Sequence, residues 1–487
     1  MERRHDLAAT LAAALAAARE RGAAWAPILE GGTRHEVARL DAAASNVARE
    51  LARAGCGAGT RIGFRVANTV AHVAGLFGIW RAGASAIPLD PRLTEGEAEG
   101  LVRHAGAAAW LEIDEDGSAR VRRRDASVGS AAPLPEGEGE DAEAVVAYTS
   151  GTTGRPKGVL LTHAHLLRAA EAVVQTRRDG PASVAAVVSP LCHVPIFVSH
   201  YLARLVSGGT VLLLGSFDPE QIPRLIREHG VTDLPLVPAM TGPLLESRDQ
   251  GGLASLTKVT VGSAMTPMSV KQALAERFPA AEILEAYGQT ESADGLTMTV
   301  GREALEHPGT VGRPHAPFRL AIRAPDGTFL PRGRQGEIVV RGPTVMRGYL
   351  GDPEATAAAL RDGWLHTGDL GRLDGDGRLY VTGRLKEIII TGGENVSPEE
   401  VEAVLARHPA VIEAVVFGTP HERWGEQVTV AVIARAEVTV EELREFARLH
   451  LAGFKLPRAL VRVDSFPRTS AGKVRRAALR DLLDRTA

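Results

Sequence analysis

Apolar residues recur along the chain with two spacings, one typical of helices and one typical of buried strands. Within residues 36–54 and 163–174 they return every three to four positions, which predicts helices with one apolar face. Short apolar runs at 61–66, 144–147 and 184–188 predict buried strands instead. Helices that alternate with such strands are typical of an α/β layer architecture with a largely parallel sheet.

The same alternation continues from residue 208 to about residue 290. Residues 219–229 predict a helix within it. The further predicted strands cover residues 208–214, 232–237, 256–261 and 283–287. We therefore expect a second α/β layer. From residue 309 to about residue 383 the pattern changes to short strands and turns, which predicts a small antiparallel, barrel-like β module.

The pattern changes again near residue 385, where we place a domain boundary. Beyond it, Ser397 and Thr439 each open a predicted helix with the spacing of a capping box. The predicted strands of this part cover residues 388–390, 411–417 and 428–433. The sequence thus predicts a large α/β N-terminal domain, residues 1–385, with two layered subdomains and the β module, followed by a smaller α+β domain, residues 386–487.

Composition limits the classes of protein to consider. A chain of 487 residues is too long for one ordinary core, and 45% hydrophobic with 24% charged residues are typical of a soluble globular protein. A net charge of -3 gives no reason to expect nucleic acid or an anionic membrane as a partner. No apolar run approaches the ~18 residues of a membrane span. Cys56 and Cys192 give neither a disulfide framework nor a metal-ligand spacing, so we expect a reducing cytoplasm.

The N-terminal segment has two interpretations. Two arginines followed by the alanine-rich residues 7–18 imitate a signal peptide, which would imply export. However, Leu7, Leu11 and Leu15 recur every fourth residue, and alanine strongly favours helix. We therefore predict a surface helix with a leucine stripe.

The stretch from Tyr148 to Gly158 carries the strongest candidate chemistry. The stretch follows a predicted strand and contains three glycines, four Ser or Thr residues and Lys157. Glycines let the backbone turn so that successive N–H groups face one concavity, and the lysine adds a mobile charge, so the loop suits a polyphosphate. It is not a Walker A loop, because Lys157 follows Pro156 and precedes Gly158. A plain linker is the alternative.

This loop resembles the phosphate-binding signature of the adenylate-forming superfamily, which includes acyl- and aryl-CoA synthetases, adenylation domains of peptide synthetases and firefly luciferase. Further family motifs follow in the same order, among them Tyr287-Gly-Gln-Thr-Glu291, Thr367-Gly-Asp369 and the loop that ends at Lys473. The resemblance covers the chain from about residue 25 onward. It implies that the C-terminal domain is a mobile lid with Lys386 at its hinge.

The resemblance assigns a nucleotide site motif by motif. It implies that ATP is bound by Thr149, Ser150, Gly151, Thr152, Thr153, Gly154, Lys157, Gly262, Ser263, Ala264, Glu285, Ala286, Tyr287, Gly288, Asp369 and Arg384. Tyr287 would stack on adenine, and Asp369 would accept hydrogen bonds from the ribose. Glu291 and Thr152 would bind Mg2+, and Thr290 would contact the phosphates.

A second set of residues is expected to line the acyl pocket: His193, Val194, Pro195, Phe197, Gly262, Gly288 and Asp294. His193 would separate the nucleotide site from the thiol tunnel, where Gly392 and Gly393 would line the path of coenzyme A. Asp294 has two interpretations, since it could face solvent or meet a polar substituent at the pocket floor. Family members often carry Gly-Gly-Ala-Pro at residues 262–265, where this chain has Gly-Ser-Ala-Met, a departure that could reshape the pocket.

The resemblance implies a reaction in two steps. A carboxylic acid and ATP give acyl-AMP and pyrophosphate, and the thiol of coenzyme A then gives acyl-CoA and AMP. Lys473, Glu291, Thr290 and His193 form the predicted catalytic set, with Lys473 bridging the carboxylate and the α-phosphate. ATP, Mg2+ and coenzyme A are the expected cofactors. We expect no nucleic-acid or membrane partner, and a homodimer is left open.

Two alternatives to an acid–CoA ligase stay open. A freestanding adenylation enzyme would load the acyl group onto a carrier protein, and a catalytically inactive member would only sense nucleotide. Residues 190–197 carry no acidic side chain for a substrate amino group, and no carrier motif follows Lys473, so we favour coenzyme A. The predicted pocket is mostly small or apolar, which suits an aryl or medium-chain aliphatic acid, and we prefer an aryl acid.

Overall fold

The computed structural model describes residues 6–20, 27–114, 116–124, 139–149, 156–249, 251–262, 266–385, 387–391, 394–421, 424–469, 472–476 and 478–479. The chain separates into two compact units. The first comprises Met1–Thr266, Val270–Arg319 and Val340–Leu365, and the second comprises Pro267–Ser269, Leu320–Val339 and His366–Ala487. The boundary predicted near residue 385 remains a prediction, and the hinge residue Lys386 lies outside the described residues.

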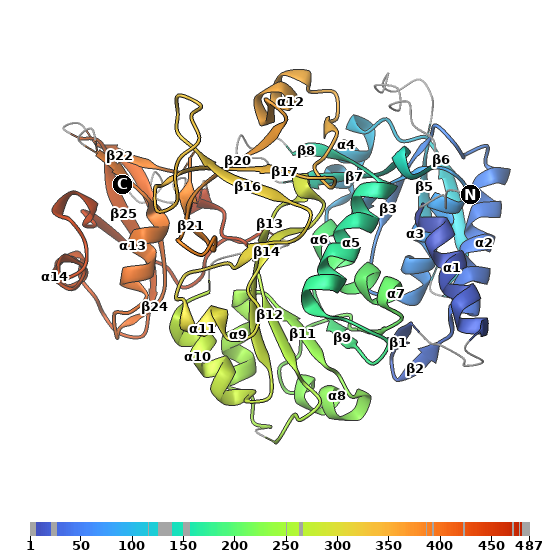
Figure 1. Cartoon of the computed structure of the whole chain (residues 1–487), viewed down its shortest axis with the longest axis horizontal. Helices are drawn as coiled ribbons and strands as arrows, with labels where there is room; N and C mark the ends of the chain where they lie inside the picture. The colour runs from blue at the N-terminus through green and yellow to red at the C-terminus, as the bar shows by residue number, and fades with distance from the viewer. Residues whose placement is uncertain are drawn as a thin grey trace. The chain divides into compact units, whose positions relative to one another are not determined.

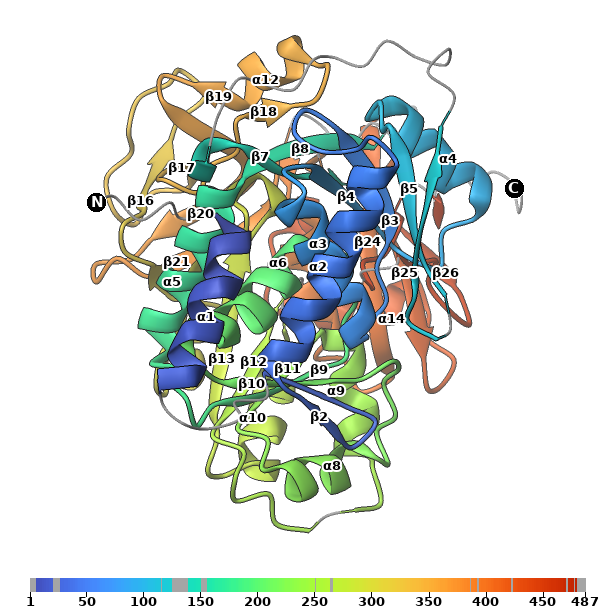
Figure 2. The same ribbon diagram turned by 90° about the vertical axis from the view of Figure 1, so that its right-hand side faces the viewer.

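A seven-stranded sheet forms one layer of the first unit (Figures 1 and 2), with the order β18-β8-β7-β4-β3-β5-β6. Its strands are β3 (Arg61–Arg65), β4 (Ser85–Leu89), β5 (Ala109–Ile113), β6 (Ala119–Arg123), β7 (Glu143–Thr149), β8 (Lys157–Thr162) and β18 (Gly348–Tyr349). The central strands β7, β4, β3 and β5 pair in parallel, and β6, β8 and β18 pair antiparallel. The strands predicted at 61–66 and 144–147 are confirmed.

Helices cover both faces of this sheet, because alternate side chains of a strand point to opposite sides. Ala86 and Val145 share a core with α1, α2 and α3, whereas Ile87 and Val146 share another core with α4. Figure 2 shows α1, α2 and α3 side by side. The helices are α1 (Leu7–Glu20), α2 (Val37–Arg53), α3 (Val70–Arg81), α4 (Glu95–His104) and α5 (His163–Arg177).

The N-terminal helix α1 is tied into this core. Leu7 and Leu11 are fully buried, and the Leu7 N–H donates a hydrogen bond to Nδ1 of His163 at 3.2 Å. The predicted helix is therefore confirmed, and Leu7 and Leu11 of its leucine stripe form a packing face.

A nine-stranded sheet forms a second layer of the first unit, with the order β15-β14-β13-β12-β11-β9-β10-β1-β2. Its strands are β1 (Ile28–Glu30), β2 (Thr33–His35), β9 (Val184–Val187), β10 (Thr210–Leu213), β11 (Asp233–Leu236), β12 (Lys258–Val261), β13 (Glu282–Gly288), β14 (Gly295–Met298) and β15 (Arg313–Pro314). The strands from β13 to β1 pair in parallel, and β2, β14 and β15 add antiparallel edges. The second α/β layer is confirmed.

The chain between these strands also forms helices and helical turns. They are α6 (Val194–Ile196), α7 (Ala203–Ser207), α8 (Ile222–His229), α9 (Pro238–Leu245), α10 (Met268–Arg277), α11 (Glu303–Glu306), the π-helical segment η2 (Phe197–Leu202) and the 3-10 turn η3 (Thr290–Ser292). Figure 1 shows α8, α9 and α10 beside β11 and β12. Ile226, Leu244 and Leu274 from these helices share a core with Leu236 and Val259.

The predicted β module is only partly a structure of its own. A five-stranded sheet contains β16 (Arg319–Arg323), β17 (Gly336–Arg341), β19 (Leu360–Arg361), β20 (Trp364–Leu373) and β21 (Leu379–Arg384). Two short strands from the same stretch pair elsewhere, since β15 pairs with β14 and β18 pairs with β8. A short apolar run predicts a strand but carries no information on its partner, which explains the difference.

The C-terminal residues form a small α+β fold around a second five-stranded sheet of order β23-β22-β25-β24, with β26 paired to β25. The elements are β22 (Ile389–Thr391), β23 (Glu394–Val396), α13 (Pro398–Leu405), β24 (Val411–His421), β25 (Gly425–Ala434), α14 (Val440–Arg448), η4 (Gly453–Lys455) and β26 (Ala459–Arg462). Val401, Leu405 and Leu443 from the helices share a core with Val416 and Val430. The predicted fold class is therefore confirmed. No helix in the described part of the chain is both long and apolar enough to cross a bilayer.

The two predicted capping boxes have different outcomes. In α14, Thr439 Oγ1 accepts a hydrogen bond from the Glu442 N–H at 3.2 Å, and the Glu442 carboxylate accepts one from the Thr439 N–H at 2.7 Å, so this box is confirmed. At α13 the prediction is wrong. Ser397 is buried there, and its hydroxyl donates to the Thr382 carbonyl at 2.6 Å instead of accepting from the helix.

Candidate active site

The strands that flank the predicted phosphate loop bring its two ends together. Thr149 at the end of β7 pairs with Lys157 at the start of β8, so the two ends of the predicted loop lie side by side. The predicted contacts Ser150, Gly151, Thr152, Thr153 and Gly154 lie outside the described residues. The backbone pairing of Lys157 thus fixes the position of this residue at the C-terminal end of the predicted loop.

Glu291 lies close to the same strand. It belongs to η3, which follows β13, and its backbone carbonyl accepts a hydrogen bond from the Met346 N–H at 2.8 Å. The Tyr349 hydroxyl donates to Glu291 Oε1 at 2.9 Å, and Lys157 Nζ lies 4.5 Å from the centre of the Tyr349 ring. Lys157 and Glu291, which come from separate motifs, are therefore brought together through Tyr349.

Tyr349 is the member of this cluster that the sequence analysis did not assign to the site. It belongs to the two-residue strand β18 and pairs with Val159 of β8. A single tyrosine after a glycine has no motif-like spacing of its own. Only the pairing of residues 348–349 with 159–160 would have indicated it, and sequence does not show that pairing.

The carboxylate of Glu291 fits a hard cation such as Mg2+, which prefers oxygen ligands. The residue is partly exposed, and the Tyr349 hydroxyl contacts only Oε1. Among the residues that the structure describes, none donates a hydrogen bond to Oε2. Thr152, the other predicted metal ligand, lies outside those residues. Of the two predicted metal ligands, Glu291 is thus the described one, and it has a carboxylate oxygen to which no described residue donates.

A different group of ligand-type side chains consists of Asp90, Cys192 and His193, whose ligand atoms lie within 4.8 Å of one another. Arg92 donates two side-chain hydrogen bonds to the Asp90 carboxylate, at 2.9 and 2.7 Å. Burial, with a smaller contribution from Asp90, raises the pKa of the Cys192 thiol to about 12. A protonated thiol and an already paired carboxylate are poor metal ligands. The group therefore gives no support for a metal site at these three residues.

Strand β13 carries four of the predicted nucleotide contacts, from Glu285 to Gly288. The Glu285 carboxylate is buried in an ion pair with Lys271 and accepts a hydrogen bond from the Thr266 N–H at 3.3 Å. Burial raises its pKa, and Lys271 offsets part of this effect. The side chain of Glu285 is therefore committed to the core, whereas Ala286 and Tyr287 are only partly buried.

Two predicted glycines lie next to this strand. Gly262 follows β12, and a Cβ placed there would come within 3.6 Å of the Ala286 carbonyl, so Gly262 and Ala286 are neighbours. Ser263 and Ala264 lie outside the described residues. At Gly288 a Cβ would lie 2.3 Å from the Asp294 carbonyl oxygen. Glycine is therefore required there by the approach of the chain's own backbone.

The loop before His193 is held by Asn68, a residue that the sequence analysis missed. Asn68 Nδ2 donates to the carbonyls of Val188 and Ser189 at 3.2 and 3.1 Å, and its Oδ1 accepts from the Leu191 N–H at 2.9 Å. His193 directly precedes α6 and is partly exposed. The buried asparagine thus fixes the position at which His193 leaves the sheet.

The predicted acyl-pocket residues after His193 face the protein core to different extents. Val194 and Phe197 are buried, and Pro195 is partly exposed. The Phe197 ring stacks on Tyr201 with centroids 5.3 Å apart and lies 5.7 Å from the ring of Trp80. Phe197 begins the π-helical segment η2, and such segments occur frequently at functional sites.

Asp294 is buried, with only 3% of its surface exposed, so the interpretation that it faces solvent is wrong. The Ser199 hydroxyl donates to Asp294 Oδ2 at 2.5 Å. Burial raises the pKa of Asp294 to about 7, although the Ser199 hydroxyl, the Gly295 N–H and Arg177 lower it. Asp294 therefore links the segment after Glu291 to η2.

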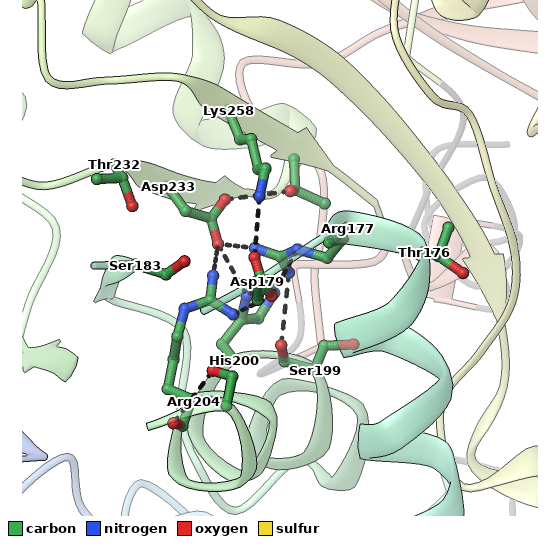
Figure 3. Close-up of polar contacts among 12 residues, drawn as sticks. Thr176, Arg177, Asp179, Ser183, Ser199, His200, Arg204, Thr232, Asp233 and Lys258 are labelled. Atoms are coloured by element: carbon green, nitrogen blue, oxygen red, sulfur yellow. Dashed lines mark hydrogen bonds and ion pairs between the residues drawn. The ribbon is translucent and has the colours of Figure 1, made fainter. Parts of the chain in front are cut away.

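A buried ionic cluster lies beside η2 (Figure 3). Arg177 of α5 and Arg204 of α7 both contact Asp233 of β11, and Arg204 also contacts Asp179 at 2.5 Å. Lys258 of β12 contacts Asp179 at 2.9 Å. Buried charges are tolerated when they are paired and hydrogen-bonded in this way. The cluster joins α5, α7, β11 and β12, and it holds the elements on both sides of η2.

In the second unit, the predicted ribose ligand and its neighbouring cation lie together. Asp369 of β20 is paired in register with Arg384 of β21. Arg384 Nε contacts Asp369 Oδ1 at 3.0 Å, and Asp369 is buried whereas Arg384 is exposed. The two residues therefore form one polar group on neighbouring strands.

Lys473 lies in a narrow turn of the second unit. The Thr469 N–H donates to the Lys473 carbonyl at 2.8 Å, and the Lys473 N–H donates to Thr469 Oγ1 at 3.2 Å. The backbone is thus fixed while the residue remains exposed. Gly392 and Gly393, predicted for the coenzyme A tunnel, lie between β22 and β23 and outside the described residues.

Comparison with known proteins identifies the family. The description "AMP-binding enzyme" matches residues 14–350, and "AMP-binding enzyme C-terminal domain" matches residues 400–473. The chain is 35% identical over 477 residues to a feruloyl-CoA synthase of Amycolatopsis sp., covering 93% of this chain and 95% of that protein. It is 34% identical over 455 residues to a 2-succinylbenzoate–CoA ligase of Geobacillus sp. strain WCH70, covering 90% of each chain.

A solved structure agrees with these relatives. The o-succinylbenzoate CoA synthetase of Bacillus subtilis, in complex with its acyl-adenylate intermediate, superposes with a TM-score of 0.85 at 27% identity, covering 96% of this chain and 97% of that one. The chain belongs to the family of AMP-binding enzymes, the adenylate-forming superfamily that its motifs resemble. Within that family it is an AMP-forming acid–CoA ligase, so the predicted class of enzyme is confirmed.

Proposed function

We propose that this enzyme joins an aryl carboxylic acid to coenzyme A through an acyl-AMP intermediate. The observation that carries the proposal is the convergence of Lys157, Tyr349 and Glu291, which puts a cation and a carboxylate beside the predicted phosphate loop. Adenylation joins two anionic reactants, so the protein must supply positive charge and oriented dipoles where negative charge accumulates. The cluster supplies positive charge from Lys157 and, in Glu291, a ligand for a cation.

In the first step the proposed roles follow from side-chain chemistry. Lys157 binds the departing phosphates as a point charge, and Glu291 holds Mg2+, which when bound neutralises phosphate charge. Asp369 accepts hydrogen bonds from the ribose hydroxyls. Lys473 bridges the substrate carboxylate and the α-phosphate, where its charge stabilises the transition state more than the ground state.

The second step requires that the lysine leave the site so that a thiol can reach the acyl carbonyl. We propose that rotation at Lys386 replaces the Lys473 turn with the turn between β22 and β23, where Gly392 and Gly393 admit the pantetheine arm. Lys473 is exposed and its turn is fixed by backbone hydrogen bonds, which suits a group that is delivered by domain movement.

An aryl acid is the proposed substrate class. Two relatives of the chain are named for ferulate and 2-succinylbenzoate, and both of these acids carry a benzene ring. The buried side chains of Val194 and Phe197 offer apolar surface to such a ring. Mg2+ as the cation and the cytoplasm as the compartment belong to the same proposal.

A panel of acids assayed with and without coenzyme A tests the proposal. Ferulate, benzoate, 2-succinylbenzoate, octanoate and malonate would each be incubated with ATP and Mg2+, and pyrophosphate, AMP and thioester would be measured. We expect thioester and AMP to form together with at least one aryl acid, and only when coenzyme A is present. Pyrophosphate release with none of the acids would contradict the proposal, as would acyl transfer to a holo carrier protein without any CoA thioester.

A further inference from the structure

Tyr349 stands between two groups of opposite charge. Its hydroxyl donates to Glu291 Oε1 at 2.9 Å, and its ring face receives Lys157 Nζ at 4.5 Å from the centroid. Among the ion pairs between described residues, none joins Lys157 directly to Glu291. One aromatic side chain thus contacts both charged groups by different parts of its surface.

The position of Tyr349 is set by its backbone on three sides. It pairs with Val159 in β8, and the next N–H, that of Leu350, donates to the Gly158 carbonyl at 2.7 Å. The Tyr349 N–H donates to Thr356 Oγ1 of α12 (Pro353–Ala359) at 2.9 Å. At Gly348, with φ of +151°, a Cβ would lie 2.6 Å from Thr356, so glycine allows α12 to pack tightly against this strand. The backbone of Tyr349 is therefore held by the sheet and by α12.

The hydroxyl contact selects one oxygen of the carboxylate. Because the phenol donates to Oε1, rotation of the carboxylate is restricted, and Oε2 is the oxygen to which no described residue donates a hydrogen bond. The hydroxyl contact therefore orients the carboxylate and leaves one of its oxygens for a ligand.

The ring contact acts on the lysine. Both charged groups contact the same side chain, and a direct ammonium–carboxylate pair between them would withdraw both from incoming ligands. A cation–π contact is weak enough to be exchanged for phosphate oxygens, which bind an ammonium more strongly. The contact with Tyr349 thus holds the Lys157 ammonium in place and leaves it able to bind phosphate oxygens.

We propose that Tyr349 is a positioning residue of the nucleotide site, which orients Glu291 for the cation through its hydroxyl and prevents Lys157 from pairing with Glu291 through its ring. The proposal rests on the proposed function, since it assigns the cation to Glu291 and the phosphates to Lys157. It adds a residue to that site and divides its action between two parts of one side chain.

The division can be tested with two substitutions at one position. Tyr349→Phe removes the hydroxyl and retains the ring, and Tyr349→Leu removes both. ATP binding would be measured by calorimetry in the presence of Mg2+ and, separately, in EDTA. We expect Tyr349→Phe to weaken binding about tenfold with Mg2+ while binding in EDTA stays unchanged, because only the oriented carboxylate is affected. Tyr349→Leu should weaken binding in both conditions.

Tyr380 provides a matched control. Its hydroxyl also contacts a carboxylate, that of Asp374 at 3.4 Å, and its ring also receives a cation, Arg372, at 4.1 Å. Tyr380→Phe and Tyr380→Leu should leave ATP affinity unchanged in both conditions. Denaturation midpoints of all four variants, compared with the unmodified enzyme, would separate binding effects from unfolding.

The outcomes separate this proposal from the proposed function. A Tyr349→Phe enzyme that is folded and binds ATP with unaltered Mg2+ dependence overturns the role of the hydroxyl. A Tyr349→Leu enzyme with unaltered affinity in EDTA overturns the role of the ring. If the unmodified enzyme binds ATP but converts none of the acids, the proposed function fails, and the binding comparison still decides the role of Tyr349.

Discussion

Burial of Asp294 gives one carboxyl group an unusual response to pH. Its side chain is buried, and burial raises its pKa to about 7. The Ser199 hydroxyl, the Gly295 N–H and Arg177 lower the pKa, but their combined effect is smaller than that of burial. An ionised carboxylate is costly in such a place unless it is paired. Asp294 therefore takes up its proton in the native state at a pH where the unfolded chain is still ionised.

The stability of the enzyme should record this proton. Since the pKa of Asp294 is raised on folding, its contribution is fully present below the unfolded pKa near 4 and is lost as pH rises through about 7. Compared with Asp294→Asn, the unmodified enzyme should gain about 1 kcal/mol in free energy of unfolding for each unit of pH lowered from 7 to 5. Urea denaturation of both proteins across this range measures the difference.

The exposed Asp326 is a suitable control for that experiment. The Thr328 backbone N–H, followed by its hydroxyl, holds the pKa of Asp326 below its usual value, so the group is ionised in both states above pH 5. The difference between the unmodified enzyme and Asp326→Asn should therefore be constant from pH 5 to 8. Parallel curves for Asp294→Asn as well would contradict the raised pKa.

From the sequence, a role in the site could be predicted for a single side chain only where a recognisable motif contains it. Lys157 and Glu291 could be assigned because each stands at a fixed place in a recognisable stretch. Tyr349 and Asn68 could not, because their roles depend on contacts with segments far away in sequence, β8 and η3 for Tyr349 and the loop after β9 for Asn68. Burial decided the remaining differences, as at Asp294 and Ser397, whose polar groups find partners inside the fold.

The contact between α10 and β13 depends on the buried pair of Lys271 and Glu285. Lys271→Met would leave the Glu285 carboxylate buried without its cation. We expect this variant to lose about 3–5 kcal/mol in free energy of unfolding, because an unpaired buried charge is much less stable than a buried pair. Urea denaturation curves give the value.

A second substitution separates lost charge pairing from lost packing at the same place. The double variant Lys271→Met with Glu285→Gln has no unpaired charge, and the glutamine can still accept from the Thr266 N–H. It should therefore be more stable than Lys271→Met alone. A double variant that is less stable than the single one would show that the pair is not the source of the effect.

The confirmed capping box of α14 gives a prediction of smaller size. Thr439→Ala removes the oxygen that accepts from the Glu442 N–H, and we expect a loss of about 1 kcal/mol in free energy of unfolding. Thr439→Ser retains a hydroxyl at the same place and should be close to the unmodified enzyme. Equal losses for the two variants would show that the methyl group, not the cap, is responsible.

Helices and strands were predictable in proportion to the strength of their apolar pattern. α2, α5, β3, β9 and β12 carry regular apolar positions and were predicted close to their observed bounds. β6 was not, because its sequence is mostly arginine and its pairing with β5 depends on partners such as Glu112, which contacts Arg122 at 3.0 Å. A charged edge strand gains stability from such cross-strand pairs, which periodicity does not reveal.

The compact units of the structure and the domains predicted from the sequence pattern divide the chain at different places. Residues 366–385 belong to the second unit together with the C-terminal residues, whereas the change of pattern predicts a boundary after them. Strands β20 and β21 resemble the strands before them in composition, so periodicity alone cannot assign them. The two groups of predicted site residues accordingly lie in different units, with Glu291 and Lys157 in the first and Asp369, Arg384 and Lys473 in the second.

This separation leads to a prediction about the two half-reactions. If Lys473 acts only while the acyl-AMP forms, Lys473→Ala should slow pyrophosphate–ATP exchange by roughly two to three orders of magnitude, as expected when one group that stabilises transition-state charge is removed. Thioester formation from supplied acyl-AMP and coenzyme A should change little, because that step uses the other face of the C-terminal domain in the proposed mechanism.

The control for this comparison is Lys455→Ala, which removes a lysine of the same unit whose amino group contacts Glu400 at 2.6 Å. It should retain both half-reactions, since a partly exposed ion pair contributes little to stability and the residue has no proposed part in the chemistry. Equal slowing of both half-reactions in Lys473→Ala would mean that the lysine supports the fold or nucleotide binding in general. An unchanged exchange rate would remove Lys473 from the mechanism, and with it the reason for the C-terminal domain to move between the two steps.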